Sequence, residues 1–327
     1  MNFKHLILAL TAVSSFSAQA ANSLNLASYA VSGIYSLDVL NGTNGGISGL
    51  EASAVTYAQD RGTLFFVGDE GTGVIEISKT GQTLGYMNFD WAGTGSTKND
   101  TEGLTYLGDG QLVVGEERLF DAYRFTYVNG GTAALASSSV SISNATVGNS
   151  GMEGISYDAR NGGSFVTIKQ ENPQGILAGT LSFSSGAGVA SMTQLFNPDL
   201  LGLATLSDVQ TLSGVNSLVG TTAADNLLIL SLGSNRLVEV TRSGVIKSSL
   251  DLAGIVPHNA IEGVTIDEKG IIYLVAEQEQ DGSVLDSLAR SRLIVLAAPV
   301  PEPETYAMLL AGLGLLGVVA RRRRPVA

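Results

Sequence analysis

A five-residue phrase recurs five times along the body of this chain, and its spacing limits the fold more than any other feature of the sequence. The copies occupy residues 53–57, 102–106, 153–157, 207–211 and 262–266. They begin 49, 51, 54 and 55 residues apart. Each copy precedes a turn and a predicted apolar strand, over residues 64–67, 111–115, 164–168, 217–221 and 271–276. Short strands repeated at about 50 residues are typical of β-propeller blades.

Further strands complete the repeating unit. A third strand is predicted over residues 73–77, 122–126 and 236–240, and a fourth within 78–86 and 241–252. A single open sheet with so many strands would leave edges unpaired. We therefore predict an all-β fold, a propeller of five blades with four antiparallel strands each. Residues 29–39 precede the first copy, and we expect them to supply the outer strand of the last blade and so close the ring.

Composition supports this class and excludes several functions. The chain has 40 Gly but 7 Pro, which suits many tight turns. It has no Cys, so disulfide frameworks, zinc–thiolate sites and cysteine nucleophiles are excluded. The formal net charge is −12, and the body is more acidic still because the basic residues gather at the ends. Such a surface repels nucleic acid and suits divalent cations or basic partners.

The first 20 residues have the pattern of a secretory signal peptide. Lys4 precedes the apolar stretch 6–13, and Ala18-Gln19-Ala20 provides a cleavage site for signal peptidase. A folded N-terminal helix is the alternative, but the stretch is too short to span a membrane and ends in small residues. We predict export across the inner membrane.

The last 29 residues form a second targeting segment. Pro301-Glu302-Pro303 leads into the apolar run 306–320, which four arginines close at 321–324. This closely resembles a PEP-CTERM sorting signal. The run would make a short, marginal transmembrane helix, held with its arginines in the cytoplasm. A permanent membrane anchor would share that topology.

The sorting resemblance implies cleavage by an exosortase in bacteria that make exopolysaccharide. We expect the cell envelope, the cell surface or the extracellular space as the destination, with the C-terminal helix as a transient anchor. The predicted domains are 1–20 (signal peptide), 21–298 (propeller) and 299–327 (sorting segment). An exopolysaccharide or a surface protein is the further partner that these features suggest.

The body resembles the SdiA-regulated propellers, distant relatives of the NHL-repeat proteins. Residues 237–252, 261–267 and 273–277 carry the resemblance, which extends over about residues 29–296. It implies five blades and a bound Ca²⁺ ion, with no established activity. Lys169 and Thr222 lie where the other units place an acid, which is a departure from the family pattern.

The repeat predicts a ring of carboxylates around the channel. Glu102, Glu153 and Glu262 open three copies of the phrase, and Ser53 and Ser207 open the other two. Glu51 lies two residues before Ser53 and shares its face. A second set of acids ends the following strand: Asp69, Glu70, Glu116, Glu117 and Glu277.

Crowded carboxylates repel one another unless they take up protons or a cation, and calcium accepts six to eight oxygen ligands. The predicted metal ligands are Glu102, Glu153, Glu262, Glu51, Asp69, Glu117 and Glu277. In the alternative, structural interpretation, each Glu bonds backbone N–H groups of the next blade and Gly allows close packing.

Three functions remain open. The first is a calcium-binding, non-catalytic propeller that binds a glycan, peptide or protein. The second is a metal-dependent hydrolase of lactonase or phosphoesterase type, with His258 as the one histidine placed to act as base. The third is a purely structural surface protein. A serine triad is not supported, because His258 is the single histidine outside the signal peptide.

Overall fold

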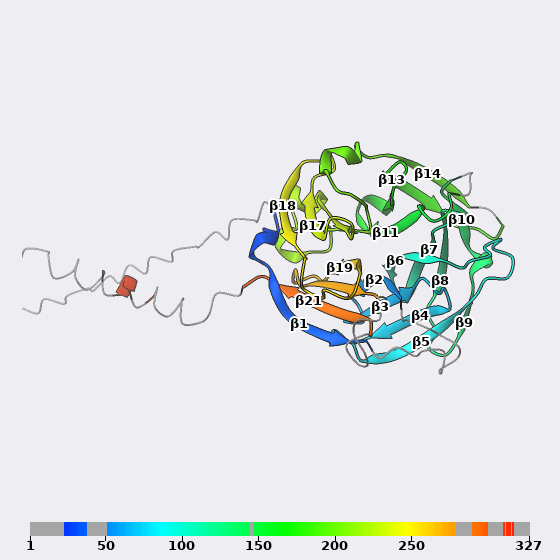
Figure 1. Ribbon diagram of the computed structural model, residues 1–327, viewed down its shortest axis with the longest axis horizontal. Helices are drawn as coiled ribbons and strands as arrows, with labels where there is room; N and C mark the ends of the chain where they lie inside the picture. The colour runs from blue at the N-terminus through cyan, green and yellow to red at the C-terminus, as the bar shows by residue number, and fades with distance from the viewer. Residues whose placement is uncertain are drawn as a thin grey trace, which may run out of the picture.

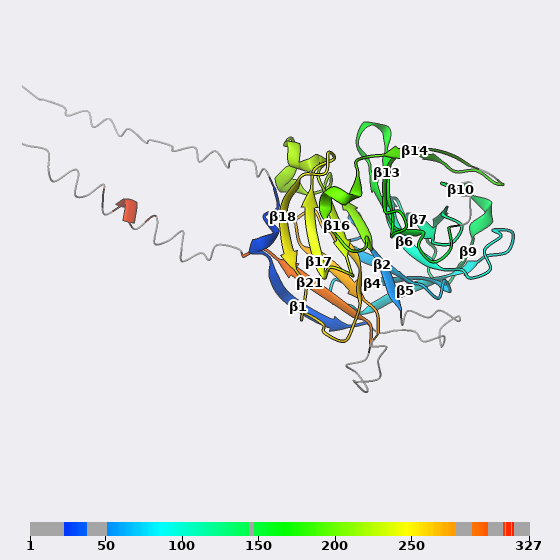
Figure 2. The same cartoon turned by 45° about the horizontal axis from the view of Figure 1, so that its top comes forward.

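The computed structural model describes residues 23–37, 51–143, 147–186, 188–278 and 290–299, together with five residues between 310 and 316. In this part of the chain five sheets stand around a central axis as the blades of a propeller (Figures 1 and 2). The predicted five-bladed all-β fold is therefore confirmed. The predicted signal peptide lies outside the described residues.

Four strands run from the axis to the rim in each blade, in chain order in most cases. Blade one contains β2 (Ala52–Ala58), β3 (Thr63–Gly68), β4 (Gly73–Ile77) and β5 (Thr83–Asp90). Blade two contains β6 (Thr101–Gly108), β7 (Gln111–Glu116), β8 (Asp121–Thr126) and β10 (Ser139–Ser141). Blade three contains β11 (Met152–Asp158), β12 (Ser164–Lys169), β13 (Gly175–Ser182) and β14 (Val189–Gln194).

The last two blades follow the same plan. Blade four contains β15 (Asp208–Thr211), β16 (Leu227–Ser231), β17 (Arg236–Val240) and β18 (Ile246–Asp251). Blade five contains β19 (Ile261–Ile266), β20 (Ile272–Ala276) and β21 (Arg292–Ala297), with β1 (Ala30–Ser36) outermost. Strand β1 pairs antiparallel with β21, with Ile34 opposite Ile294. The N-terminal segment therefore closes the ring, as predicted.

Two details differ from the prediction. The strand expected over 217–221 is wrong, because 3₁₀ turns flank that segment at Asn216–Leu218 and Thr222–Asp225. Thr221 caps the second turn by accepting the Ala223 N–H at 3.2 Å, and the more apolar run of β16 forms the strand instead. A short strand, β9 (Thr132–Ala134), also adds in parallel to the outer edge of β5.

Apolar clusters fill the spaces between neighbouring blades. Phe65 and Val67 of blade one, for example, pack in one buried cluster with Leu104 and Leu112 of blade two. The single tryptophan, Trp91, packs against this cluster and donates its indole N–H to the Gly71 carbonyl at 2.6 Å. Trp91 therefore packs between blades.

The innermost strands are joined by hydroxyl groups at the fourth position of the phrase. Each accepts a backbone N–H from the next blade: Thr56 from Tyr106 at 3.1 Å, Thr105 from Tyr157 at 2.9 Å, Ser156 from Thr211 at 2.9 Å and Thr265 from Tyr57 at 3.1 Å. In the remaining copy Gln210 occupies this position and its side chain accepts the Thr265 hydroxyl at 3.0 Å. These hydrogen bonds, which we call the ladder, join the inner strands of neighbouring blades, so the fourth position of the phrase helps to close the ring.

Candidate metal centre at the acidic mouth of the channel

A β-bulge falls on the first residue of the phrase in four of the five inner strands. Strand pairing jumps from Thr101 to Gly103, and the same jump occurs in β2, β11 and β19. The residues that have no opposite residue in the strand pairing are Glu102, Ser53, Glu153 and Glu262. Because a bulge re-aims the extra side chain, the three glutamates leave the regular alternation of their strands.

Three of the five copies have Gly at the second position of the phrase, where the inner strands approach closely. A Cβ on Gly154 would lie 2.4 Å from Asp208 Oδ1 and 2.9 Å from the Val209 nitrogen. A Cβ on Gly263 would lie 2.8 Å from the Ser53 carbonyl oxygen. The predicted role of Gly in close packing is thus confirmed.

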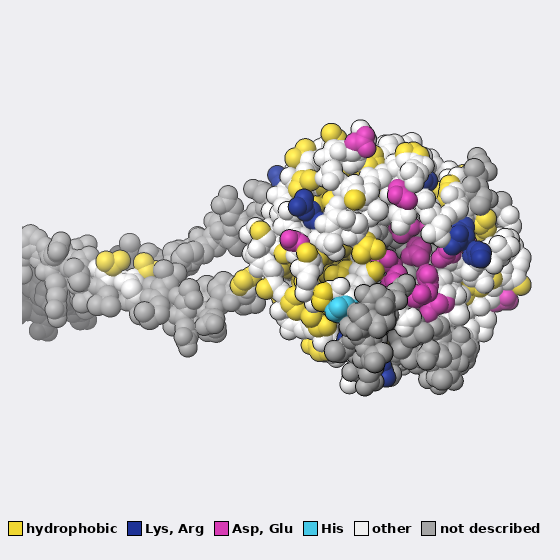
Figure 3. Space-filling view, in the orientation of Figure 1, with side chains coloured by type: hydrophobic (Ala, Val, Ile, Leu, Met, Phe, Trp, Pro, Cys, Tyr) yellow, Lys and Arg dark blue, Asp and Glu magenta, His cyan; other side chains and the backbone are white. Residues whose placement is uncertain are grey.

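Acidic side chains gather where the inner strands begin, near the middle of one face of the ring (Figure 3). Asp69, Asp100 and Glu102 each place a carboxylate oxygen within 4.8 Å of the others, and so do Glu51, Asp69 and Glu70. Asp69 belongs to both groups. We call these two overlapping groups the cluster; they span blades one and two and contain three of the predicted ligands, Glu51, Asp69 and Glu102.

The other predicted ligands lie around the same mouth as two pairs. Glu153 lies beside Glu117 and Glu262 lies beside Glu277, and in each pair burial and the neighbouring carboxylate raise the pKa of the phrase glutamate. The hollow at this mouth has a volume of about 590 Å³, and its lining includes Glu51, Asp69, Glu262 and Glu277. Exposed His258 lines the same hollow.

Burial and mutual repulsion favour the protonated form of these carboxyl groups. Burial raises the pKa of Glu102 well above its ordinary value, and the charges of Glu153 and Glu262 raise it further. Burial and the neighbouring Glu51 raise the pKa of Asp69 to about 9. Burial, with the charge of Asp100, raises the pKa of Glu117 to about 7. A cation at this mouth would displace such protons.

One atom of the cluster lacks a hydrogen-bond partner. Asp69 Oδ1 is buried without one among the described residues. Asp100 is neutralised in part, because its Oδ2 lies 2.7 Å from Arg118 Nε. The oxygen-only donor set and the unpartnered acceptor fit a hard cation such as Ca²⁺.

Backbone N–H groups of a neighbouring blade bond to two other acids. Glu117 Oε1 accepts the Gly151 N–H at 3.3 Å, and Asp208 Oδ2 accepts the Val264 N–H at 2.7 Å. Asp208 also accepts the Val209 N–H at 2.7 Å and is buried within the ring. The alternative, structural interpretation expected the phrase glutamates to accept backbone N–H groups of the next blade. Glu117 and Asp208 accept such hydrogen bonds instead.

The register corrects the placement of the second acid set. Asp69, Glu117 and Glu277 occupy equivalent positions in blades one, two and five. The backbone N–H of each donates to the carbonyl of the residue just before the inner strand of its own blade. Gln170 has this position in blade three, not Lys169. In blade four it is Leu232, which follows β16, not Thr222. Glu116 does not face the cluster: it accepts the Ser96 hydroxyl at 2.7 Å and the Leu119 N–H at 2.7 Å.

Comparison with known proteins identifies two segments of the chain. Residues 35–279 match the model of the SdiA-regulated family, and residues 299–324 match the PEP-CTERM protein-sorting motif. The sorting motif implies processing by exosortase, so the chain is an exported, surface-sorted propeller. No helix among the described residues is long and apolar enough to cross a membrane. Most of the helix predicted over 306–320 lies outside the described residues.

Solved structures with a similar fold include two enzymes. Myxococcus xanthus glutaminyl cyclase is 13% identical, with 83% of this chain and 97% of that chain covered and a TM-score of 0.49. A luciferin-regenerating enzyme is 11% identical, with 76% and 91% covered and a TM-score of 0.45. Identities this low do not carry an activity from one chain to another.

Proposed function

The chain belongs to the SdiA-regulated family, and we propose that it is a calcium-binding, non-catalytic binding module of the cell envelope or of an exopolysaccharide matrix. The observation that carries this proposal is the group formed by Asp69, Asp100 and Glu102, with its unpartnered buried oxygen. Signal peptidase is the proposed partner for removal of residues 1–20, and the C-terminal helix is the proposed transient anchor.

The residues that would hold the ion are Asp69, Asp100 and Glu102, with Glu51 and Glu70 beside them. Bound calcium supplies positive charge to carboxylates that otherwise repel. Asp69 follows β3 of blade one, whereas Asp100 and Glu102 belong to the start of blade two. A cation held by all three would therefore stabilise the contact between these blades.

The experiment compares thermal unfolding of the full-length chain, purified in nonionic detergent, with chelator and with excess calcium. At a free concentration of 100 times Kd, calcium adds about 2.7 kcal/mol to stability. For a domain of this size that amounts to a rise in Tm of roughly 5–10 °C. Elemental analysis of the same sample should find near-stoichiometric calcium.

The matched variants are Glu102→Gln and Asp251→Asn, which each replace one carboxyl group by the corresponding amide. Glu102→Gln should weaken calcium binding at least tenfold, because a ligand charge is lost. Asp251 is exposed on the outer strand β18, so its replacement should leave calcium binding unchanged. Absence of bound calcium and of any chelator effect would reject the calcium proposal.

One observation favours the hydrolase as a second candidate. His258 lines the same hollow as Asp69 and Glu262, so an ion-activated water and a general base could meet there. The calcium-loaded chain is assayed with lactones and phosphate esters. Turnover that disappears in His258→Ala would support the hydrolase, and absence of turnover would support the binding module.

A further inference from the structure

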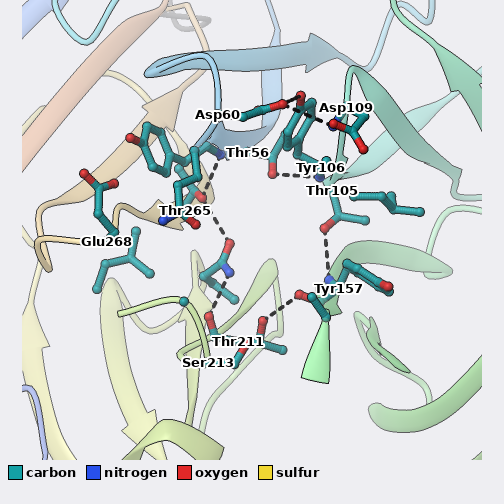
Figure 4. A pocket seen from close by; sticks show the side chains of 18 residues that line it. Thr56, Asp60, Thr105, Tyr106, Asp109, Tyr157, Thr211, Ser213, Thr265 and Glu268 are labelled. Carbon is teal, nitrogen blue, oxygen red and sulfur yellow. Dashed lines mark hydrogen bonds between the residues drawn. The ribbon is translucent and has the colours of Figure 1, made fainter. Parts of the chain in front are cut away.

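The channel has a second mouth at the opposite ends of the inner strands. The last phrase position lies four residues after the first, and this step corresponds to roughly 13 Å along a strand. The turns that follow β2, β6, β15 and β19 surround a pocket there with a volume of about 520 Å³ (Figure 4). This pocket shares no lining residue with the acidic hollow.

Hydroxyl and amide groups line the middle of this pocket. Thr56, Thr105, Thr211 and Thr265 point toward it from four blades, joined by the ladder of hydrogen bonds (Figure 4). Gln210 is fixed among them, because its amide donates to the Thr211 carbonyl at 2.9 Å. The ladder holds these groups in place before any ligand arrives, so little ordering cost remains for binding.

Tyrosines and carboxylates form the rim. Tyr57, Tyr106 and Tyr157 occupy the last position of three phrases and are each half-buried. Asp60 is already engaged, since it accepts the Tyr106 hydroxyl at 3.0 Å and the Asp109 N–H at 3.2 Å. The rim thus presents rigid aromatic surface next to hydrogen-bonding groups.

Glu268 stands out among the rim residues. It lines the pocket from the turn after β19, and its Oε2 is buried without a hydrogen-bond partner in the described part of the chain. A carboxylate at this place is an acceptor for the hydroxyl groups of a ligand, and a charge-assisted hydrogen bond of this kind is stronger than a neutral one.

The charge of the pocket excludes anionic ligands. Asp60, Asp109 and Glu268 line it, whereas its described lining contains neither Lys nor Arg. Lys79, next to Tyr57, is committed elsewhere, since its Nζ lies 2.8 Å from buried Asp267. A small cation would use the acceptors alone, whereas a polyol uses donors and acceptors together and rests on aromatic surface.

We propose that this pocket binds one or two neutral sugar units. The volume is in the range of small-ligand pockets. The inference deepens the proposed function, because it names the ligand of the binding module, and its biological meaning rests on that function. It places the ligand at the mouth opposite the candidate metal centre.

The test is calorimetric titration of the full-length chain with glucose, galactose, mannose, maltose and cellobiose. Glucuronate serves as the anionic probe and choline as the cationic probe. We expect millimolar binding of at least one neutral sugar and none of glucuronate. Glu268→Gln should weaken sugar binding about tenfold, because a charged acceptor is lost. Asp251→Asn should leave it unchanged.

Three outcomes would overturn the inference: no neutral sugar binds, choline binds more tightly than every sugar, or Glu268→Gln binds sugar as tightly as the wild type. Thermal unfolding of Glu268→Gln in the absence of sugar shows whether that variant is folded. Calcium binding is measured on the same preparations. Calcium binding without sugar binding would reject this inference alone, and the reverse would reject the metal centre alone.

Discussion

Gly154→Ala should destabilise the propeller far more than the equivalent change Gly103→Ala. A Cβ added at Gly154 would lie 2.4 Å from Asp208 Oδ1, 2.9 Å from Asp208 Cα and 2.9 Å from the Val209 nitrogen. Two of these three atoms are backbone, so the inner strand of blade four would have to move. The Asp208 carboxylate would move with it, although it accepts the Val209 and Val264 N–H groups.

A Cβ added at Gly103 meets a softer neighbour. Its closest contacts are Ile155 Cγ2 at 3.0 Å and the Ile155 nitrogen at 3.4 Å, and the Ile side chain can adjust. Overpacking a close contact costs typically about 1–3 kcal/mol, and Gly→Ala returns about 0.4–1 kcal/mol by restricting the unfolded chain. We expect Gly154→Ala to cost about 3 kcal/mol, because hydrogen bonds are strained as well, and Gly103→Ala to cost under about 1 kcal/mol.

Urea unfolding measures both variants against the wild type. The expected result is a lower midpoint for Gly154→Ala at an unchanged slope, which denotes lost stability without a change in the surface exposed. The Tm of the same variant should fall by roughly 6–12 °C at about 2–4 °C per kcal/mol. Equal midpoints for the two variants would refute the argument that close strand approach requires Gly in the phrase.

The remaining predictions concern contacts between blades. Thr105→Val keeps the side-chain shape but leaves the Tyr157 N–H without its acceptor. It should lower the free energy of unfolding, measured in urea, by about 1–3 kcal/mol. The control variant, Thr193→Val on the exposed edge strand β14, should change this free energy little. Asp158 accepts two hydrogen bonds from the Arg160 guanidinium, at 2.9 and 2.7 Å, and one from Arg242 of blade four at 3.3 Å. Burial tends to raise the pKa of Asp158, but the bonds and charge of Arg160 outweigh it and lower the pKa. Because the pKa of Asp158 is lower in the folded chain than in the unfolded chain, its carboxylate stabilises the fold at pH values above the ordinary Asp pKa of about 3.9. This stabilisation is lost as the pH falls toward the folded-state pKa. The stability gap between wild type and Asp158→Asn should therefore narrow from about pH 6 to about pH 3, and a constant gap would contradict the assigned role.

Much of the fold follows from local pattern. The copies of the phrase fall on β2, β6, β11, β15 and β19, and the apolar stretches at 64–67, 111–115, 164–168 and 271–276 fall in the second strands. Alternation and turn residues are local properties, so the sequence displays them directly. The strand at 217–221 was wrong because a capped 3₁₀ turn uses the same small polar residues that a strand end can use.

The candidate site was predicted in part. Asp69 and Glu102, two of the predicted ligands, lie in one group with Asp100, whereas Asp208 holds two blades together. Asp208 takes the place of Gly in the fourth copy of the phrase, and this difference is the feature of the sequence that could have identified Asp208. That Gln170 and Leu232 take the place of the second acid in blades three and four could be read only from the register, which is a property of strand pairing.

The sequence by itself determined the number of blades, the closing segment and the acids that open three of the five units, because repetition and spacing are visible along the chain. Tertiary structure alone decided which of those acids meet, that the phrase glutamates sit on bulges, and that the fourth-position hydroxyls form a ladder around the second mouth. The physical reason is that these contacts join different hairpins, with separations from 33 positions between Asp69 and Glu102 to 208 between Tyr57 and Thr265, and the packing of neighbouring blades decides which residues become partners.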